Sequence, residues 1–148
     1  MAQTYTHRLR VRFSETDAQA VVFYANYVAY FDILMTEFWR DAVAGGYTDM
    51  VESGTDMVVI ETTCRYHAPA LFDDELDLNA TVTRLGNTSM STAISIERPA
   101  DGATIVTGEI HHVFIDPATK TKRPIPDAIR AGLEPYLAQP NSQPAPTA

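Results

Sequence analysis

Acidic and aromatic residues crowd the segment Phe13–Phe31, which reads FSETDAQAVVFYANYVAYF. Two acids, Glu15 and Asp17, stand in a predicted loop, and a helical pattern follows from near Tyr24 and Asn26. A loop carboxylate can act as a base or a nucleophile, or it can do no more than bond the backbone N–H two residues on. A helix start offers unpaired N–H groups and a favourable dipole to an anion. The segment therefore brings an acid close to a set of N–H donors.

One long helix follows this loop. From Asn26 to Ala42 the apolar residues recur at spacings of three and four, which predicts a helix of about five turns. The helix is apolar around more than one stripe, so most of its circumference should be covered. Gly45 and Gly46 end the pattern as a C-cap would.

Five strands are predicted around the helix. Alternation predicts a first strand over Thr6–Phe13, with Phe13 on the same core-facing side as Leu9 and Val11. The other four strands are expected over Met57–His67, Glu75–Leu85, Thr88–Arg98 and Thr104–Asp116. Short turns between them imply an antiparallel sheet, and wrapping that sheet around the helix gives an α+β layout.

The segments outside the sheet are short. Thr48–Ser53 is expected to be a connecting segment, and Ile125–Leu137 a brief closing helix with Asp127 as its N-cap. Residues 1–138 are predicted to form one domain. The Pro-rich tail over 139–148 is expected to be disordered.

Composition argues against several classes of partner. The chain has 148 residues, of which 45% are hydrophobic and 20% charged, as expected of one globular domain with a core. A formal net charge of −8 argues against a nucleic-acid or anionic-membrane partner. The single cysteine, Cys64, allows no internal disulfide and suits a reducing compartment. The sequence contains neither a signal peptide nor a membrane span, so we expect a cytoplasmic protein.

The motifs of the opening segment resemble those of a known family. The run RFSETDAQAVVFYANYVAYFD, followed by YHAPALFDDEL, RLGNTSM and the final IP, is similar to the hotdog-fold acyl-CoA thioesterases of the 4-hydroxybenzoyl-CoA thioesterase family. The resemblance extends from about Arg8 to about Tyr136. It implies a hotdog fold, in which a five-stranded antiparallel sheet wraps around one long central helix. It also implies an enzyme that hydrolyses an acyl-CoA to a carboxylic acid and CoA.

The resemblance assigns roles within the run TDxxxxVxYxNY. Asp17 matches the family's acid, which either attacks the thioester carbonyl or takes a proton from water. The backbone N–H of Tyr24 matches the oxyanion contact. Val22, Asn26 and Tyr27 are expected to line the substrate site. Neither a metal nor a cofactor is expected, because a thioester is already an activated acyl donor; coenzyme A enters only as part of the substrate and product.

Further residues are candidates for substrate contacts. Asp32 falls where aryl-specific members of the family place an acid near the polar end of the acyl group, and otherwise lies on the exposed strip of the helix. His67 either lines the cleft or is a hydrogen-bonded structural side chain. Arg84 and Ser89 are candidates for the CoA phosphate site, and further basic candidates are Arg65, Lys120, Lys122 and Arg123. The turn LGNTSM lacks the cationic cluster of some relatives, which keeps an acyl carrier protein open as the substrate's carrier.

Other residues near these motifs have structural interpretations. Glu15 is expected to be solvated or paired with an arginine. Ala20 occupies a position where relatives often have Gly, so a positive φ there would strain the loop. Cys64 is expected to be a small buried residue and not a nucleophile. His111 and His112 should point to opposite faces of a strand, which argues against a shared metal.

The resemblance implies a homodimer or homotetramer with the acyl tunnel along a subunit interface. Two other functions stay open. A hotdog dehydratase or hydratase needs a histidine near the acid, and His67 within reach of Asp17 would favour that function. A non-catalytic protein that binds acyl thioesters would show binding without turnover.

Overall fold

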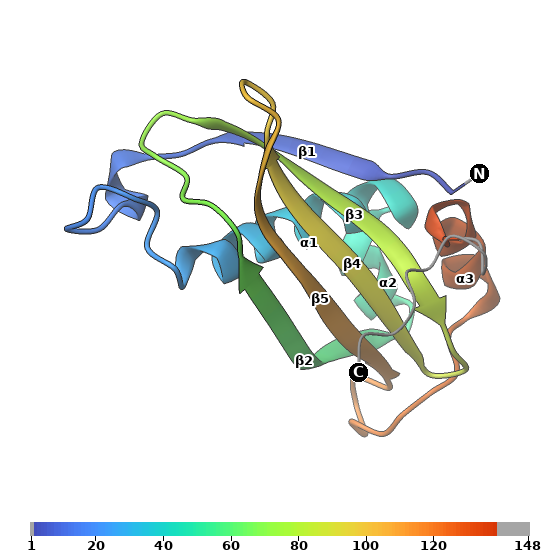
Figure 1. The fold of residues 1–148 in the computed structure, drawn as a ribbon. Coiled ribbons are helices and arrows are strands. Elements are labelled where there is room, and N and C mark those ends of the chain that lie inside the picture. Colours follow the sequence, from blue (N-terminus) through green and yellow to red (C-terminus); the bar gives the residue numbers. More distant parts are fainter. Residues whose placement is uncertain (1, 139–148) are drawn as a thin grey trace, which may run out of the picture.

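A 17-residue helix is the central element of the computed structural model, which describes residues 2–138. This helix, α1 (Asn26–Ala42), lies across one face of a single sheet (Figure 1). Its length corresponds to about 4.7 turns, which agrees with the predicted helix. Its buried side chains are those of Tyr27, Tyr30, Phe31, Leu34, Met35, Phe38, Trp39 and Ala42.

Five antiparallel strands form the sheet. In chain order they are β1 (Tyr5–Arg10), β2 (Asp56–Tyr66), β3 (Glu75–Leu85), β4 (Ser89–Arg98) and β5 (Ala103–Ile115). Their spatial order is β1-β3-β4-β5-β2, so β1 and β2 are the two edges (Figure 1). The four later strands lie within one residue of their predicted bounds. The α+β layout, a five-stranded antiparallel sheet around one long helix, is confirmed.

The core lies between α1 and the sheet, because both present apolar side chains to that space. Leu34 and Phe38 of α1 are fully buried. Facing them, the inward residues of β3, β4 and β5 include Leu76, Leu78, Met90, Ile94, Ile96, Val106, Ile110 and Phe114. The elements approach most closely at Gly108, where a Cβ atom would lie 2.3 Å from the carbonyl oxygen of Thr63 and 2.9 Å from the ring of Phe31. A larger residue there would push β5 away from both neighbours.

The first strand is shorter than predicted. β1 ends at Arg10, and Phe13–Glu15 form a 3₁₀ turn, η1. Phe13 is 75% exposed, so the prediction that it faces the core was wrong. The cause is local: the backbone N–H of Arg12 donates to Glu15 Oε1 at 2.7 Å, which turns the chain and ends the alternation.

The segment after α1 is helical, so the prediction of a simple connector over Thr48–Ser53 was wrong. It belongs to α2 (Gly46–Glu52), which the buried side chain of Met50 anchors to the core. The predicted stop at Gly45 and Gly46 lies three residues beyond the last residue of α1. Both glycines adopt positive φ values, +78° and +70°, as the chain reverses into α2.

Two short helical elements end the described chain. In α3 (Asp127–Leu133) the N-cap is Pro126, so the prediction of Asp127 was wrong by one position. A 3₁₀ turn, η2 (Glu134–Tyr136), follows. The predicted disordered tail over 139–148 lies outside the described residues. Within residues 2–138, none of the helices is long and apolar enough to span a bilayer.

Candidate active site at the start of the long helix

Asp17 lies at the beginning of a tight loop before α1. A bridge between Thr16 and Val22 closes the loop. The backbone of Asp17 bonds across it: its N–H donates to Val21 O, and its carbonyl accepts from Ala20 N–H, both at 2.9 Å. One carboxylate oxygen, Oδ1, accepts from Gln19 N–H at 2.8 Å. The other oxygen accepts no hydrogen bond within residues 2–138, so Asp17 is fixed by a turn and still has an oxygen to offer a ligand.

Ala20 occupies the left-handed backbone region in this loop, with φ of +64°. Glycine adopts this region freely, whereas a Cβ atom costs about 1 kcal/mol or more there. The loop therefore follows a path that suits glycine, although this chain carries alanine. The hydrogen bond from Ala20 N–H to Asp17 O helps to hold that strained path.

Glu15 ties the loop to α1 and is not a free acid. Its Oε1 accepts from the hydroxyl of Tyr30 at 3.0 Å and from the backbone N–H of Arg12 at 2.7 Å. Glu15 is half-buried and its arginine partner is the backbone of Arg12, while its bond to Tyr30 was not expected. Burial, followed by the bond to Glu15, raises the pKa of Tyr30, so its hydroxyl remains a proton donor. The side-chain amide of Asn26 donates to the carbonyl of Glu15 at 2.8 Å and adds a second tie.

Not every backbone donor at the start of α1 is bonded within residues 2–138, and the N–H of Tyr24 is one that is left open. Val22 N–H donates to Ala70 O, and Phe23 N–H to Glu15 O, both at 2.9 Å. For the N–H of Tyr24, no hydrogen bond is found within residues 2–138. An N–H at a helix start, with the dipole of α1 behind it, can stabilise negative charge on an oxygen.

Aromatic side chains pack around Tyr24. Tyr24 is 63% exposed, and its ring centroid lies 4.8 Å from that of Phe23 and 6.4 Å from that of Tyr66. The Tyr66 hydroxyl also donates to the carbonyl of Tyr24 at 3.2 Å. Tyr27 is buried, and its hydroxyl accepts from the N–H of Ala70 at 3.2 Å. Sequence reasoning missed Tyr66, because it ends β2 and only the folded sheet brings it to the helix start.

A groove lies further along α1, between the helix and β2. It encloses about 280 Å³ and includes Asp32, which is exposed at its rim. The other lining residues are Met35, Thr36, Trp39, Tyr47, Met57, Val59 and His112. Asp32 is thus exposed on the helix, as one of its two expectations has it, and it also lines a hollow; its contact with an acyl group stays a prediction.

Three further candidates from the sequence have hydrogen-bond partners other than Asp17 and Tyr24. The ring of His67 bonds the hydroxyl of Thr107 at 2.8 Å, in keeping with the expected structural histidine. Arg84 Nη1 donates to the hydroxyl of Ser89 at 2.9 Å across the β3–β4 turn. That turn is at the far end of β3 from the loop, about 30 Å along the strand from Glu75. Within one chain, the Arg84–Ser89 pair and Asp17 therefore belong to different ends of the molecule (Figure 1).

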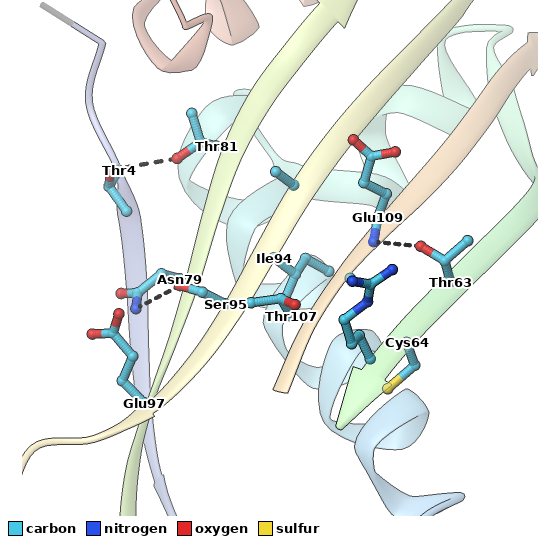
Figure 2. A pocket seen from close by; sticks show the side chains of 13 residues that line it. Thr4, Thr63, Cys64, Asn79, Thr81, Ile94, Ser95, Glu97, Thr107 and Glu109 are labelled. Atoms are coloured by element: carbon cyan, nitrogen blue, oxygen red, sulfur yellow. Dashed lines mark hydrogen bonds between the residues drawn. The ribbon is translucent and has the colours of Figure 1, made fainter. Parts of the chain in front are cut away.

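A larger hollow, of about 900 Å³, lies on the sheet face away from α1. Figure 2 shows its polar lining, in which Glu109 N–H donates to the hydroxyl of Thr63. Its other polar residues include Arg65, Asn79, Ser95, Glu97 and Thr107. The chemistry described above is on another part of the molecule, so the size of this hollow does not mark the candidate active site.

Cys64 and the two neighbouring histidines have the orientations expected. Cys64 is half-buried beside the core, and burial raises the pKa of its thiol, which disfavours a nucleophilic thiolate. His111 Nδ1 and the hydroxyl of Ser91 bond at 2.7 Å. His112 lies on the opposite side of β5, 4% exposed, where its ring meets that of Trp39.

Comparisons with known proteins agree with this architecture. A family model described as "Thioesterase superfamily" matches residues 19–105. The Escherichia coli O6:H1 protein named acyl-CoA thioester hydrolase YbgC is 32% identical over 123 residues, which cover 83% of this chain and 90% of the relative. A shorter match to an Aquifex aeolicus protein named as an esterase is 33% identical over 81 residues and covers 55% of this chain and 62% of that protein. The solved structure of BH1999 gentisyl-coenzyme A thioesterase superposes with a TM-score of 0.75 at 25% identity, covering 88% of this chain and 99% of that one.

Proposed function

Because the chain belongs to the thioesterase superfamily, we propose that it hydrolyses the thioester bond of an acyl-CoA, giving a carboxylic acid and CoA. One observation carries the proposal: the loop acid Asp17 keeps an unpaired oxygen, and the N–H of Tyr24 at the start of α1 is open. An acid and an oxyanion donor are the two groups that this reaction needs.

In the proposed reaction, Asp17 acts by one of two routes. Its carboxylate attacks the thioester carbonyl carbon, or it takes a proton from a water molecule that attacks instead. In both routes the carbonyl oxygen becomes negatively charged, and the N–H of Tyr24 donates to it. The C–S bond then breaks and CoA leaves as its thiol after taking up a proton. In the first route, water afterwards hydrolyses the mixed anhydride on Asp17.

Asp32 and the aromatic residues suggest what the acyl group looks like. One solved relative is named gentisyl-coenzyme A thioesterase, and the name describes an aryl thioester as its substrate. This supports an aryl acyl group for this chain. Asp32, on the rim of the groove along α1, is our candidate for contact with a polar end of that group. Val22, Asn26 and Tyr27 are proposed to shape the wall near the thioester. An acyl carrier protein in place of CoA is the alternative carrier.

We propose a homo-oligomer built on the edge strand β2. Val58, Val59 and Ile60 of this edge are 41%, 56% and 62% exposed, and such an edge favours pairing with another strand. A two-fold axis would pair β2 with a second β2 in antiparallel fashion. That arrangement would bring the partner subunit's Arg84 and the partner subunit's Ser89 toward the end that holds Tyr24. The phosphates of CoA could then bind the partner while the thioester lies at Asp17.

The oligomer proposal has its own test in Ile60→Glu, which places a charge on the exposed edge. We expect this variant to be monomeric by size-exclusion chromatography with light scattering, and to lose thioester hydrolysis with the partner's contribution. Ala100→Glu, which places the same charge on the exposed turn between β4 and β5, is the matched control and should keep both the oligomer and the activity. A monomeric wild type with full activity would overturn the proposal.

The two other functions are less well supported by the geometry. A dehydratase or hydratase would need His67 beside Asp17, but its ring is bonded to Thr107. A binding protein without turnover would need neither a loop acid with an unpaired oxygen nor an open N–H at the helix start. A cytoplasmic location is part of the proposal, since a lone Cys64 suits a reducing compartment.

The test is release of CoA thiol from short-chain, long-chain and aryl acyl-CoA esters. We expect wild type to hydrolyse at least one class and Asp17→Asn to be slower by about 10²-fold or more. Asp127→Asn, an exposed acid on α3, is the control and should match wild type. Hydrolysis of no ester by wild type would contradict the proposed function, and equal rates for Asp17→Asn would remove Asp17 from the mechanism.

A further inference from the structure

The groove along α1 and the candidate active site share one row of residues on the helix surface. Tyr24, Val28, Asp32 and Thr36 follow one another at four-residue spacing, so they form one row along the helix. Val28 is 44% exposed, and Asp32 and Thr36 line the groove. From Asn26 to Asp32 the helix rises by about 9 Å, a span that an acyl group of several bonds can cover. An acyl group bound at the helix start can therefore extend along this row into the groove.

His112 forms part of the groove and has an unusual environment. It comes from β5, pairs across the sheet with Val59 of β2, and is 4% exposed. Its Nδ1 is fully buried without a hydrogen-bond partner, and no hydrogen bond to either ring nitrogen is found within residues 2–138. Buried polar side chains nearly always have a partner, so an unpaired imidazole calls for an explanation.

The surroundings of His112 are apolar except at the rim. The ring of Trp39 packs against it edge-on with the centroids 6.2 Å apart, and Met35 and Met57 line the same hollow. Burial, and to a lesser degree the nearby His111, lowers the pKa of His112 to about 4. Near pH 7 the ring is therefore neutral and carries one N–H donor and one acceptor nitrogen. A neutral imidazole in an apolar hollow suits a neutral hydroxyl or carbonyl group better than an ion.

We propose that His112 is a specificity-determining residue, which hydrogen-bonds a neutral oxygen near the far end of the acyl group in the groove beside Asp32. The proposal rests on the proposed function, since it assumes an acyl thioester at the helix start. Asp32 carries a negative charge at the rim, so a hydroxyl is favoured over a carboxylate in the bound group. The volume of about 280 Å³ is at the small end of ligand pockets, so one ring or a short branched group fits and a long chain does not.

The experiment compares binding of benzoyl-CoA with binding of its 3-hydroxy and 4-hydroxy derivatives. Binding is measured on Asp17→Asn protein, in which turnover is slowed, with and without His112→Phe. Phe keeps the ring and removes both nitrogens. We expect His112→Phe to lower the preference for the better hydroxylated ester by at least about tenfold, while benzoyl-CoA binds as before.

Two control variants distinguish a role of His112 in substrate specificity from a purely structural role. His111→Phe changes the neighbouring residue on the opposite face of β5 and should leave the preference unchanged. His112→Gln restores a donor and an acceptor, and it should recover part of the preference.

The outcomes distinguish this proposal from the proposed function. Binding of every ester with no preference for a hydroxyl, an equal loss for all esters in His112→Phe, or no binding of any ester would overturn the role of His112. Turnover by wild type decides the proposed function separately: wild type can hydrolyse benzoyl-CoA even if the role of His112 is wrong.

Discussion

The two ends of α1 differ in how completely their groups are paired and covered. At the start, Tyr24 is 63% and Val28 44% exposed, and the N–H of Tyr24 has no partner within residues 2–138. At the far end, Phe38 is 0% and Trp39 3% exposed, and Val43 N–H closes the helix by donating to Trp39 O at 3.0 Å. Exposed aromatic rings and open donors reduce stability but permit ligand binding. We therefore propose the open start as the functional end, with the closed end supplying stability.

The largest effect on stability is expected at the closed end. Phe38 is fully buried and its ring contacts those of Tyr5, Trp39 and Tyr136. Phe38→Ala should lower the free energy of unfolding by about 3–5 kcal/mol, because the cavity cannot close. Urea denaturation measures this. Val28→Ala is the matched control at the open end and should cost less than about 1 kcal/mol; equal losses would remove the difference between the two ends.

The second-largest effect on stability is expected on acidification, because His112 is buried without a hydrogen-bond partner. The unfolded chain protonates this histidine below about pH 6.5, whereas the folded protein does so only below about pH 4. The unfolded state thus binds more protons in this window, and stability falls as the pH is lowered from 6.5 to 4, by about 1.4 kcal/mol per pH unit. Urea denaturation between pH 7 and 4.5 should reveal this loss in wild type and a smaller one in His112→Phe. Parallel curves would contradict a buried neutral His112.

A smaller effect is expected where the loop is tied to the helix. Tyr30→Phe removes the hydroxyl that donates to Glu15 and should lower the free energy of unfolding by about 1–2 kcal/mol, because the bond reaches a charged acceptor. Tyr24→Phe removes an exposed hydroxyl and should change stability by less than about 0.5 kcal/mol. If the two variants lose the same stability, the Tyr30–Glu15 bond does not hold the loop.

The smallest effect is expected at the strained loop position. Ala20→Gly relieves a positive φ and should stabilise the protein by up to about 1 kcal/mol. Ala18→Gly, at an ordinary φ in the same loop, should instead cost a few tenths of a kcal/mol. Thermal and urea unfolding of both variants provide the comparison. Destabilisation by Ala20→Gly would mean that the folded loop tolerates alanine without strain.

The sheet and the long helix could be predicted because their patterns are strong and local. Alternation in Glu75–Leu85 and the spacing of three and four in α1 each repeat several times. The 3₁₀ turn at Phe13 depends on one side chain, Glu15, reaching back to the backbone, and α2 depends on one buried residue, Met50. A single contact of this kind produces no periodic pattern in the sequence, so these two elements could not be predicted.

The candidate site could be predicted only in its local part. Asp17 and Tyr24 are close in the sequence, so one sequence motif contains both residues and both could be predicted. Tyr66 and His112 reach the helix from β2 and β5, and only the strand register decides that they do. The lack of a hydrogen-bond partner for His112 depends on its three-dimensional surroundings. The spacing of residues in the sequence does not reveal it.

The central claim is that the open start of α1 performs the chemistry while the rest of the chain holds it in place. Thioester turnover and the free energy of unfolding, measured together on Asp17→Asn, test it most directly. The asparagine oxygen can still accept from Gln19 N–H, so we expect stability to change by less than about 0.5 kcal/mol. Turnover should fall by about 10²-fold or more, because the carboxylate is lost. Turnover equal to that of wild type, with the fold intact, would contradict the account.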